Sequence, residues 1–306
     1  MKLIKPKKLK KGDTIGLLSV SGERESDEKI HNAERYINSL GYKTVVSETS
    51  YKKFRHYAGT DEERINALHE FFERDDINAI VCTRGGYGVL RLVNKIDFNF
   101  IRKYAKLFCG YSDISILLLL LYKKIGLVTL HGAMTDGDFG NNNICDYTAQ
   151  SFWHALTGFE NKVIKADNNP EVFLEGEAKG ILWGGNLTTI ASMIGIDFMP
   201  NRKFIFFFED VNEPAYKIDR MLTQLFNYTK FRQNVAGIAV GEFTEADSMD
   251  YINQVIREYA QKYNLPCCNG FRISHNREKI TIPVGLKCSF STETKSIVLR
   301  ESVFCD

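Results

Sequence analysis

The sequence predicts an α/β protein, with a parallel-sheet α/β sandwich domain in its first half and a smaller α/β domain in its second. Short apolar runs alternate with helical patterns between residues 14 and 130. Repeated strand-loop-helix units of this kind imply a parallel sheet with helices on both faces. Residues 135–175 are instead rich in Asp, Asn and Gly. We therefore expect an N-terminal domain over 1–140, a linker over 141–175 and a C-terminal domain over 176–306.

In the first domain, helix signals separate the apolar runs. Apolar residues recur at helical spacing from Ile30 to Leu40, and Gly41 ends this helix as a C-terminal cap. Thr60 and Glu63 form a capping box for the next helix. The expected strands are 14–20, 42–46, 79–83, 106–110 and 126–130, and a third helix starts at 114.

The second half repeats the alternation less regularly. We expect a short linker helix over 149–156 and helices that start near Leu187, Tyr216 and Met249. The expected strands of the second domain are 180–183, 204–208, 235–240, 280–283 and 296–299.

Composition argues against several classes of protein. The 306 residues carry 40 Lys and Arg against 38 Asp and Glu, and a net charge of +2 provides little attraction for nucleic acid. The longest apolar stretch, 114–122, is about half of the ~20 residues that a bilayer requires. The basic start, 1–13, is followed by no apolar segment. We expect a solvated leader there rather than a signal peptide, with a basic arm for an anionic partner as the other interpretation.

Cysteine usage favours a reducing compartment. The seven cysteines are an odd number and show no CxxC spacing, so we expect no structural zinc site. Several lie in apolar strand-like runs, as inert core thiols do. A cytoplasmic protein is therefore expected.

Ser112 is the strongest candidate for chemistry. Ligands bind beyond the carboxyl ends of the strands in an open parallel sheet, and three loops qualify: 84–88, 110–113 and 209–210. Ser112 lies at a strand-to-helix turn, where free N–H groups and the helix dipole would stabilise an oxyanion. The segment 110–114 matches only part of the nucleophile elbow. A helix-capping role for Ser112 or Asp113 is the alternative.

The glycine pair Gly85-Gly86 could complete an oxyanion site. Glycine allows a close approach of the backbone, and these N–H groups could share an oxyanion with the N–H of Asp113. A phosphate-binding loop is a rival interpretation, although 84–88 matches neither common phosphate-loop pattern. The third interpretation is a turn with a purely structural role.

A serine nucleophile also needs a base. Of the six histidines, His131 and His275 lie next to expected strands. Glu209 follows a run of three phenylalanines at the end of an expected buried strand, so its charge needs a partner. It could orient a histidine, as the acid of a triad does. The alternatives are a structural salt bridge, with Arg220 as the partner, or a cap for the expected helix over 216–222.

Taken together, these segments resemble the LD-carboxypeptidase family of serine peptidases, whose members trim D-alanine from murein tetrapeptides. The resemblance covers nearly the whole chain in the family's order. The most specific segment is EDVNEPAYKIDRML over 209–222. The other matching segments are 12–16, 58–64, 84–88, 110–113, 131–134, 184–187, His275 and 282–285.

The resemblance implies a function and a site. The function is a serine carboxypeptidase that releases the terminal D-alanine of murein tetrapeptides in peptidoglycan recycling, through an acyl-enzyme and with no metal or cofactor. The implied triad is Ser112, Glu209 and His275, and the implied oxyanion donors are the backbone N–H groups of Gly86 and Asp113, with Gly85 as the near alternative. The active site is then expected in the interdomain cleft, and a homodimer is implied.

Two departures from the family pattern stand out. Ser274 replaces the Gly that usually precedes the histidine, and the loop 19–22, SVSG, lacks the usual Pro. The first is expected to alter the loop of the base and the second the rim of the substrate site. Neither removes a triad member.

Two other functions remain open at this level. Some relatives confer self-immunity to a microcin C type antibiotic by cleaving an acyl-sulfamoyl or phosphoramidate bond, and Trp153 or Trp183 could stack on its adenine, although both are expected in the core. A non-catalytic protein that binds a nucleotide or peptide at 84–88 is the other. Labelling of Ser112 by a fluorophosphonate would favour the enzyme.

Overall fold

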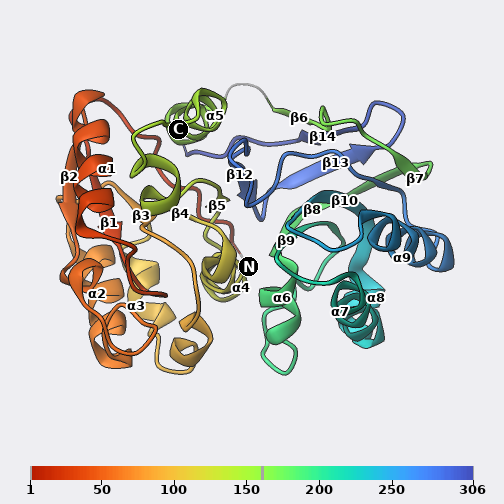
Figure 1. The fold of residues 1–306 in the computed structure, drawn as a ribbon, viewed down its shortest axis with the longest axis horizontal. Coiled ribbons are helices and arrows are strands. Elements are labelled where there is room, and N and C mark those ends of the chain that lie inside the picture. Colours follow the sequence, from red (N-terminus) through yellow and green to blue (C-terminus); the bar gives the residue numbers. More distant parts are fainter. Residues whose placement is uncertain (1, 160–161, 306) are drawn as a thin grey trace. The chain divides into compact units, whose positions relative to one another are not determined.

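The computed structural model describes residues 2–159 and 162–305. It divides into two compact units. The first comprises Met1–Phe159, Ile280–Pro283 and Val303–Asp306, and the second comprises Glu160–Lys279 and Val284–Ser302. Each unit carries its own mixed α/β architecture around its own sheet, which is the expected fold class (Figure 1).

A six-stranded sheet forms the centre of the first unit, in the order β12-β5-β4-β3-β1-β2. The pairs between β2, β1, β3, β4 and β5 are all parallel, as the alternating pattern predicts. Its strands are β1 Thr14–Leu18, β2 Lys43–Val46, β3 Ala79–Cys82, β4 Leu107–Gly110, β5 Thr129–His131 and β12 Ile282–Val284.

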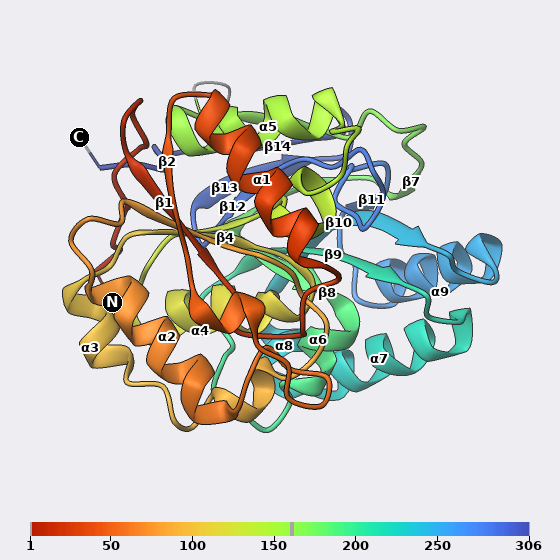
Figure 2. The same ribbon diagram turned by 60° about the vertical axis from the view of Figure 1, so that its left-hand side comes forward.

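Helices cover both faces of this sheet. Figure 2 shows α1 and α5 on one face and α2, α3 and α4 on the other. The expected capping box is confirmed: Thr60 accepts a hydrogen bond from the Glu63 N–H and the Glu63 carboxylate accepts one from the Thr60 N–H. The helices are α1 Asp27–Ser39, η1 Glu48–Tyr51, α2 Asp61–Glu73, η2 Val89–Leu92, α3 Phe98–Lys103, η3 Ser112–Ile114, α4 Ser115–Ile125, η4 Thr135–Phe139 and α5 Asp146–Thr157.

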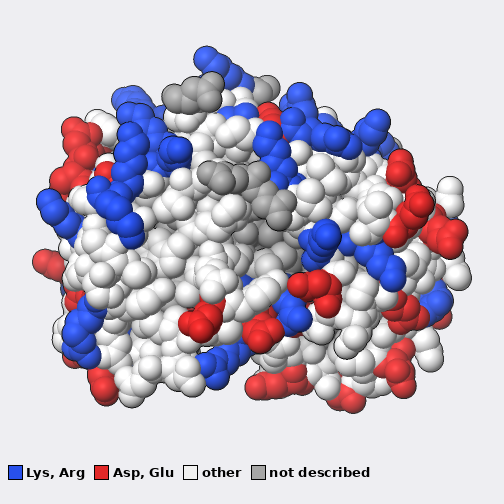
Figure 3. Space-filling model, turned by 90° about the horizontal axis from the view of Figure 1, so that it is seen from above, with Lys and Arg blue, Asp and Glu red and all other residues white. Residues whose placement is uncertain are grey.

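The basic leader packs along the first unit. Ile4 forms a parallel bridge with Leu127, and its carbonyl accepts a hydrogen bond of 2.9 Å from the N–H of Val128. Leu9 is buried. Lys7 and Lys8, which lie between these anchors, are exposed. On the face that Figure 3 shows, Lys and Arg side chains occur together with Asp and Glu, consistent with a net charge of +2.

An eight-stranded sheet forms the second unit, in the order β6-β14-β13-β8-β9-β10-β11-β7. Its centre, from β8 to β11, is parallel, and its two margins are antiparallel. The strands are β6 Val163–Lys165, β7 Val172–Leu174, β8 Glu177–Asn186, β9 Phe204–Val211, β10 Val235–Thr244, β11 Cys267–Cys268, β13 Lys287–Ser291 and β14 Ser296–Leu299.

Aromatic side chains fill the core of the second unit. Trp183 is fully buried and packs on Phe204 and Phe206, with ring centroids 4.9 and 6.0 Å apart. Phe231 of α8 meets the same two phenylalanines edge to face. These contacts fix the strand that leads to Glu209. The helices of this unit are α6 Leu187–Ser192, α7 Ala215–Asn227, α8 Thr229–Asn234 and α9 Met249–Lys262.

Two segments differ in placement from the sequence expectations. The segment 141–175 supplies α5 to the first unit and β6 and β7 to the second. Residues 280–283, expected in the second domain, extend the first sheet through β12. The physical reason is that a three-residue strand carries no signal for its partner, because an apolar run fits the edge of either sheet. Among the described residues, no helix is long and apolar enough to cross a membrane.

Candidate active site

Ser112 lies at a sharp turn between β4 and α4. Its φ of +61° places a non-glycine residue in the left-handed region, a conformation that costs energy and often marks functional turns. Gly110 makes the turn possible, since a Cβ there would lie 2.8 Å from Cγ2 of Ile114. Ser112 is partly exposed, whereas Asp113 is buried. A serine in this conformation directly before a helix is typical of a nucleophile elbow, although the sequence of 110–114 matches only part of that motif.

The glycine pair after β3 comes directly against this turn. A Cβ on Gly85 would lie 2.7 Å from the Cβ of Ser112 and 2.8 Å from its Oγ, so only glycine allows this approach. Gly86 has a φ of +111°. The carbonyl of Gly85 accepts a 3.0 Å hydrogen bond from the N–H of Gly22. In a trans peptide the following N–H points the opposite way, so the Gly86 N–H faces away from Gly22.

Glu209 and His275 form a buried pair in the second unit. Oε2 of Glu209 lies 2.5 Å from Nδ1 of His275. Glu209 is fully buried, and the His275 side chain is 16 % exposed. A carboxylate can only accept, so Nδ1 carries the hydrogen and Nε2 is left as the basic nitrogen. This is how the acid of a triad orients its histidine.

Neighbouring strands position this pair. Glu209 lies on β9, and the segment before His275 attaches to the adjacent strand β10, where the N–H of Glu242 donates to the carbonyl of Ile273 at 2.9 Å. A Cβ on Gly241 would lie only 2.4 Å from that carbonyl oxygen and 3.1 Å from the Cβ of Glu209. Glycine at this position therefore lets the histidine segment reach the carboxylate.

Electrostatics favours a basic imidazole. Burial lowers the pKa of His275, but the charge of Glu209 and its hydrogen bond outweigh burial, and the pKa is raised above its usual value. Burial, with a smaller contribution from the charge of Glu209, raises the pKa of Asp210 to about 6. The carboxylate of Asp210 accepts hydrogen bonds from Asn186 and Thr188 at the start of α6.

The two departures fit the local structure. Ser274 is buried, and its Oγ accepts a 3.1 Å hydrogen bond from the N–H of Asn276, which closes the turn around His275. In the loop 19–22, the hydroxyl of Ser21 donates to the carboxylate of Asp113 at 2.5 Å. Both serines therefore contribute polar contacts that glycine or proline could not make.

The structure groups the candidate residues within each unit. The first unit holds Ser112, Asp113, Gly85 and Gly86 around one turn, and the second holds Glu209 and His275 in contact.

His131, the other histidine considered, belongs to the first unit. It is buried beside Tyr111, with ring centroids 6.1 Å apart. The tryptophans considered as adenine platforms are packed. Trp183 lies in the core, and Trp153 stacks on Tyr42 with ring centroids 4.8 Å apart and donates to the hydroxyl of Tyr36.

Three contributions were not evident from the sequence: the side-chain contacts of Asp113, those of Asp210, and the role of Gly241. Their partners lie at distant positions, so spacing gives no signal. The sequence indicates only that each residue lies close to the end of an expected buried strand. Across residues 2–159 and 162–305, no group of three or more His, Cys, Asp or Glu is arranged to hold a metal ion.

Two family models match the chain. The LD-carboxypeptidase N-terminal domain matches residues 15–132, and the LD-carboxypeptidase C-terminal domain matches residues 179–290.

Relatives cover almost the whole chain. A probable murein peptide carboxypeptidase of Bacillus subtilis is 33% identical over 98% of this chain and 95% of its own length. The microcin C7 self-immunity protein MccF of Escherichia coli is 28% identical over 95% of this chain and 94% of its own. The crystal structure of a muramoyltetrapeptide carboxypeptidase from Oxalobacter formigenes has a TM-score of 0.80 and 27% identity, covering 93% of this chain and 97% of that one. The chain therefore belongs to the LD-carboxypeptidase family of serine peptidases.

Proposed function

We propose that this protein releases the terminal D-alanine from murein tetrapeptides by hydrolysing the L,D-peptide bond. The observation that carries the proposal is the partly buried Glu209–His275 hydrogen bond, which orients an imidazole of raised pKa. A serine in a left-handed elbow beside a glycine turn supports it from the first unit. The substrate class is taken from relatives named murein peptide and murein tetrapeptide carboxypeptidase.

In the proposed mechanism, the Oγ of Ser112 attacks the carbonyl carbon while Nε2 of His275 takes the hydroxyl proton. Glu209 keeps the imidazole oriented and stabilises its charged form. The N–H groups of Gly86 and Asp113 stabilise the oxyanion. His275 then gives its proton to the amine of D-alanine as the bond breaks, and water hydrolyses the acyl-enzyme in a second, equivalent step.

Several finer points belong to the same proposal. The reaction draws its nucleophile from the first unit and its acid and base from the second, in an interdomain cleft. The protein acts in the cytoplasm, in peptidoglycan recycling, as a homodimer. The mechanism uses no metal or cofactor, so treatment with a chelator leaves the rate unchanged.

The Ser112→Ala variant tests the function. Removing a triad member lowers the rate by about 10⁴ to 10⁶. Release of D-alanine from a murein tetrapeptide is measured by coupled oxidation or chromatography. Ser26→Ala, which loses only a surface helix cap, is the matched control and keeps wild-type activity. Near-normal cleavage by Ser112→Ala would overturn the mechanism.

Hydrolysis of a microcin C type conjugate is the second candidate, because the MccF relative also matches along nearly the whole chain. The packed positions of Trp153 and Trp183 do not offer the adenine platform considered from the sequence. Measuring kcat/KM on the tetrapeptide and on an aminoacyl sulfamoyl adenosine side by side decides between the two. We expect the tetrapeptide to be the better substrate.

A further inference from the structure

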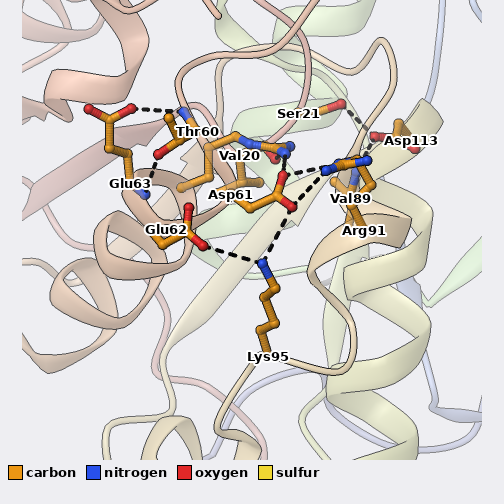
Figure 4. Close-up of polar contacts among 11 residues, drawn as sticks. Val20, Ser21, Thr60, Asp61, Glu62, Glu63, Val89, Arg91, Lys95 and Asp113 are labelled. Carbon is orange, nitrogen blue, oxygen red and sulfur yellow. Dashed lines mark hydrogen bonds and ion pairs between the residues drawn. The ribbon is translucent and has the colours of Figure 1, made fainter.

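The carboxylate of Asp113 joins three segments around the elbow. Its Oδ2 accepts a 2.5 Å hydrogen bond from the hydroxyl of Ser21 and a 3.0 Å hydrogen bond from the N–H of Val89. Figure 4 shows the side chains of Ser21 and Asp113 directed at one another, with Val89 on the same carboxylate. Asp113 is only 6% exposed, so these bonds form away from bulk water.

Both partners of this carboxylate control the glycine turn. Val89 begins η2, directly after the segment that contains Gly85 and Gly86. Ser21 precedes Gly22, whose N–H holds the carbonyl of Gly85 and thereby sets the direction of the next N–H. The Asp113 side chain thus contacts the glycine turn in two ways. It binds Val89 at the end of the turn directly, and it binds the segment of Ser21 and Gly22 that holds the Gly85 carbonyl.

Other contacts on this turn do not involve the elbow. The carboxylate of Asp61 forms ion pairs with Arg91 of η2 at 3.0 Å and with Arg64 at 2.7 Å (Figure 4). Arg64 also donates to the carbonyl of Val20 at 2.9 Å. These bonds attach η2 and the loop 19–22 to α2. Asp113 differs from Asp61, Arg64 and Arg91 because it is the residue directly after Ser112. Its own backbone N–H is therefore one of the two proposed oxyanion donors.

We propose that Asp113 is a positioning residue that fixes the distance and direction between the two oxyanion donors, the N–H groups of Gly86 and of Asp113 itself. This inference rests on the proposed function, and extends it from the backbone of Asp113 to its side chain. A single residue then supplies one donor directly and places the other through Ser21 and Val89. Preorganised donors of this kind stabilise charge that develops only in the transition state.

The charge of the carboxylate argues for this geometric role. A buried negative charge beside a developing oxyanion repels it and would slow the reaction. Arg64 lies close enough to interact with the charge of Asp113, which offsets part of this repulsion. If the carboxylate acted through charge alone, Asp113→Ala would raise kcat. The geometric role predicts a fall instead, because alanine has no oxygen to accept the hydrogen bonds of Ser21 and Val89.

Asp113→Ala, with Asp97→Ala as its matched control, tests the proposal. Asp97 accepts the N–H of Phe100 at the start of α3, so the control loses one hydrogen bond in the same unit. We expect kcat of Asp113→Ala on a murein tetrapeptide to fall about 10²-fold, comparable to the loss of one oxyanion donor, with KM changed less than about threefold. A smaller folded fraction would also lower the apparent kcat at unchanged KM, so kcat is calculated per folded enzyme, measured by circular dichroism.

Two further measurements keep the test decisive. Ser21→Ala removes one of the two hydrogen bonds and should lower kcat by about tenfold, and it replaces Asp113→Ala if that variant does not fold. Amide hydrogen exchange of residues 84–89 should become faster in both variants while the rest of the first unit keeps its protection. Unchanged kcat, or unchanged exchange of this segment, overturns the proposal. If the wild type releases no D-alanine, the proposed function fails, and the exchange data alone then decide whether Asp113 holds the turn.

Discussion

At the scale of single residues, the Glu209–His275 pair makes the pH dependence of the reaction testable. In the proposed mechanism His275 must be neutral to accept a proton, so kcat/KM is expected to fall as the pH drops through its pKa. Because Glu209 raises that pKa, the acid limb of the wild type should lie above the ordinary histidine value of about 6.5. In Glu209→Gln, burial still lowers the pKa while the opposing charge is gone, so the limb moves to lower pH.

The pH–rate profile of kcat/KM measures this shift. Glu209→Gln should also lower the plateau by up to about 10⁴-fold, since the imidazolium loses its counter-charge. Glu278→Gln is the control, because Glu278 is an exposed carboxylate on the same loop, paired with Arg272. An acid limb that stays in place in Glu209→Gln would mean that another group titrates in the wild type.

Residues with a local signal were predictable and residues with distant partners were not. Ser112 and Glu209 stand out because each follows a buried apolar run. The role of Gly241 depends on the carbonyl of Ile273 and on Glu209, which lie 32 residues away in opposite directions. The carboxylate of Asp113 likewise meets Ser21, 92 residues before it. Such contacts exist only after the sheet has brought the segments together.

At the scale of elements, most parallel strands, the antiparallel strand β14 and the capped helices were predictable, whereas the shortest strands of the second sheet were not. The parallel strands are buried apolar runs between helices, and the capping box of α2 involves neighbours three residues apart. By contrast, β6, β7 and β11 are two or three residues long. A run that short has no measurable periodicity, and its pairing depends on the rest of the sheet.

The carboxylate of Asp210 links β9 to the start of α6, and its contribution to stability can be tested. It lies on β9, and its carboxylate accepts the Nδ2 of Asn186 at 2.9 Å and the N–H and hydroxyl of Thr188 at 2.8 Å each. Asp210→Ala removes the acceptor that these donors of the buried Asn186 and the half-buried Thr188 share, and each lost hydrogen bond costs about 1–3 kcal/mol. We expect the free energy of unfolding of this unit to fall by about 2–4 kcal/mol.

Urea unfolding followed by amide hydrogen exchange measures this change in the second unit alone, where tryptophan fluorescence would mix the two units. Asp247→Ala is the matched control. Its carboxylate is exposed and accepts only the N–H of Ala215 at the start of α7, so its loss should cost about 1 kcal/mol. Equal losses in the two variants would contradict the linking role of Asp210.

At the scale of the whole molecule, the chain does not divide at a single linker. It leaves the first unit after Phe159, returns to it for Ile280–Pro283 and returns again for Val303–Asp306. The first sheet is therefore complete only when residues from the end of the chain join it as β12. Composition could indicate the change of character after residue 135, but it could not indicate these returns, because they involve only a few residues each.

The proposed mechanism requires residues of both units to act in the same reaction step. Ser112 belongs to the first unit and His275 to the second. If the two residues act in one proton-transfer step, removing either one abolishes the same contribution to the rate. The double variant Ser112→Ala, His275→Ala should then be no slower than Ser112→Ala alone, at about 10⁴ to 10⁶ below the wild type.

A double-mutant cycle on D-alanine release, run to long incubation times, tests this directly. Independent contributions would multiply and leave the double variant far below either single variant. Ser112→Ala combined with Asp247→Ala is the control pair across the two units. Asp247 accepts only the N–H at the start of α7, so adding its substitution should not change the residual rate of the folded enzyme. If the rate reduction of the double variant Ser112→Ala, His275→Ala equals the product of the two single reductions, the two residues act in separate steps. The proposed triad would then be wrong.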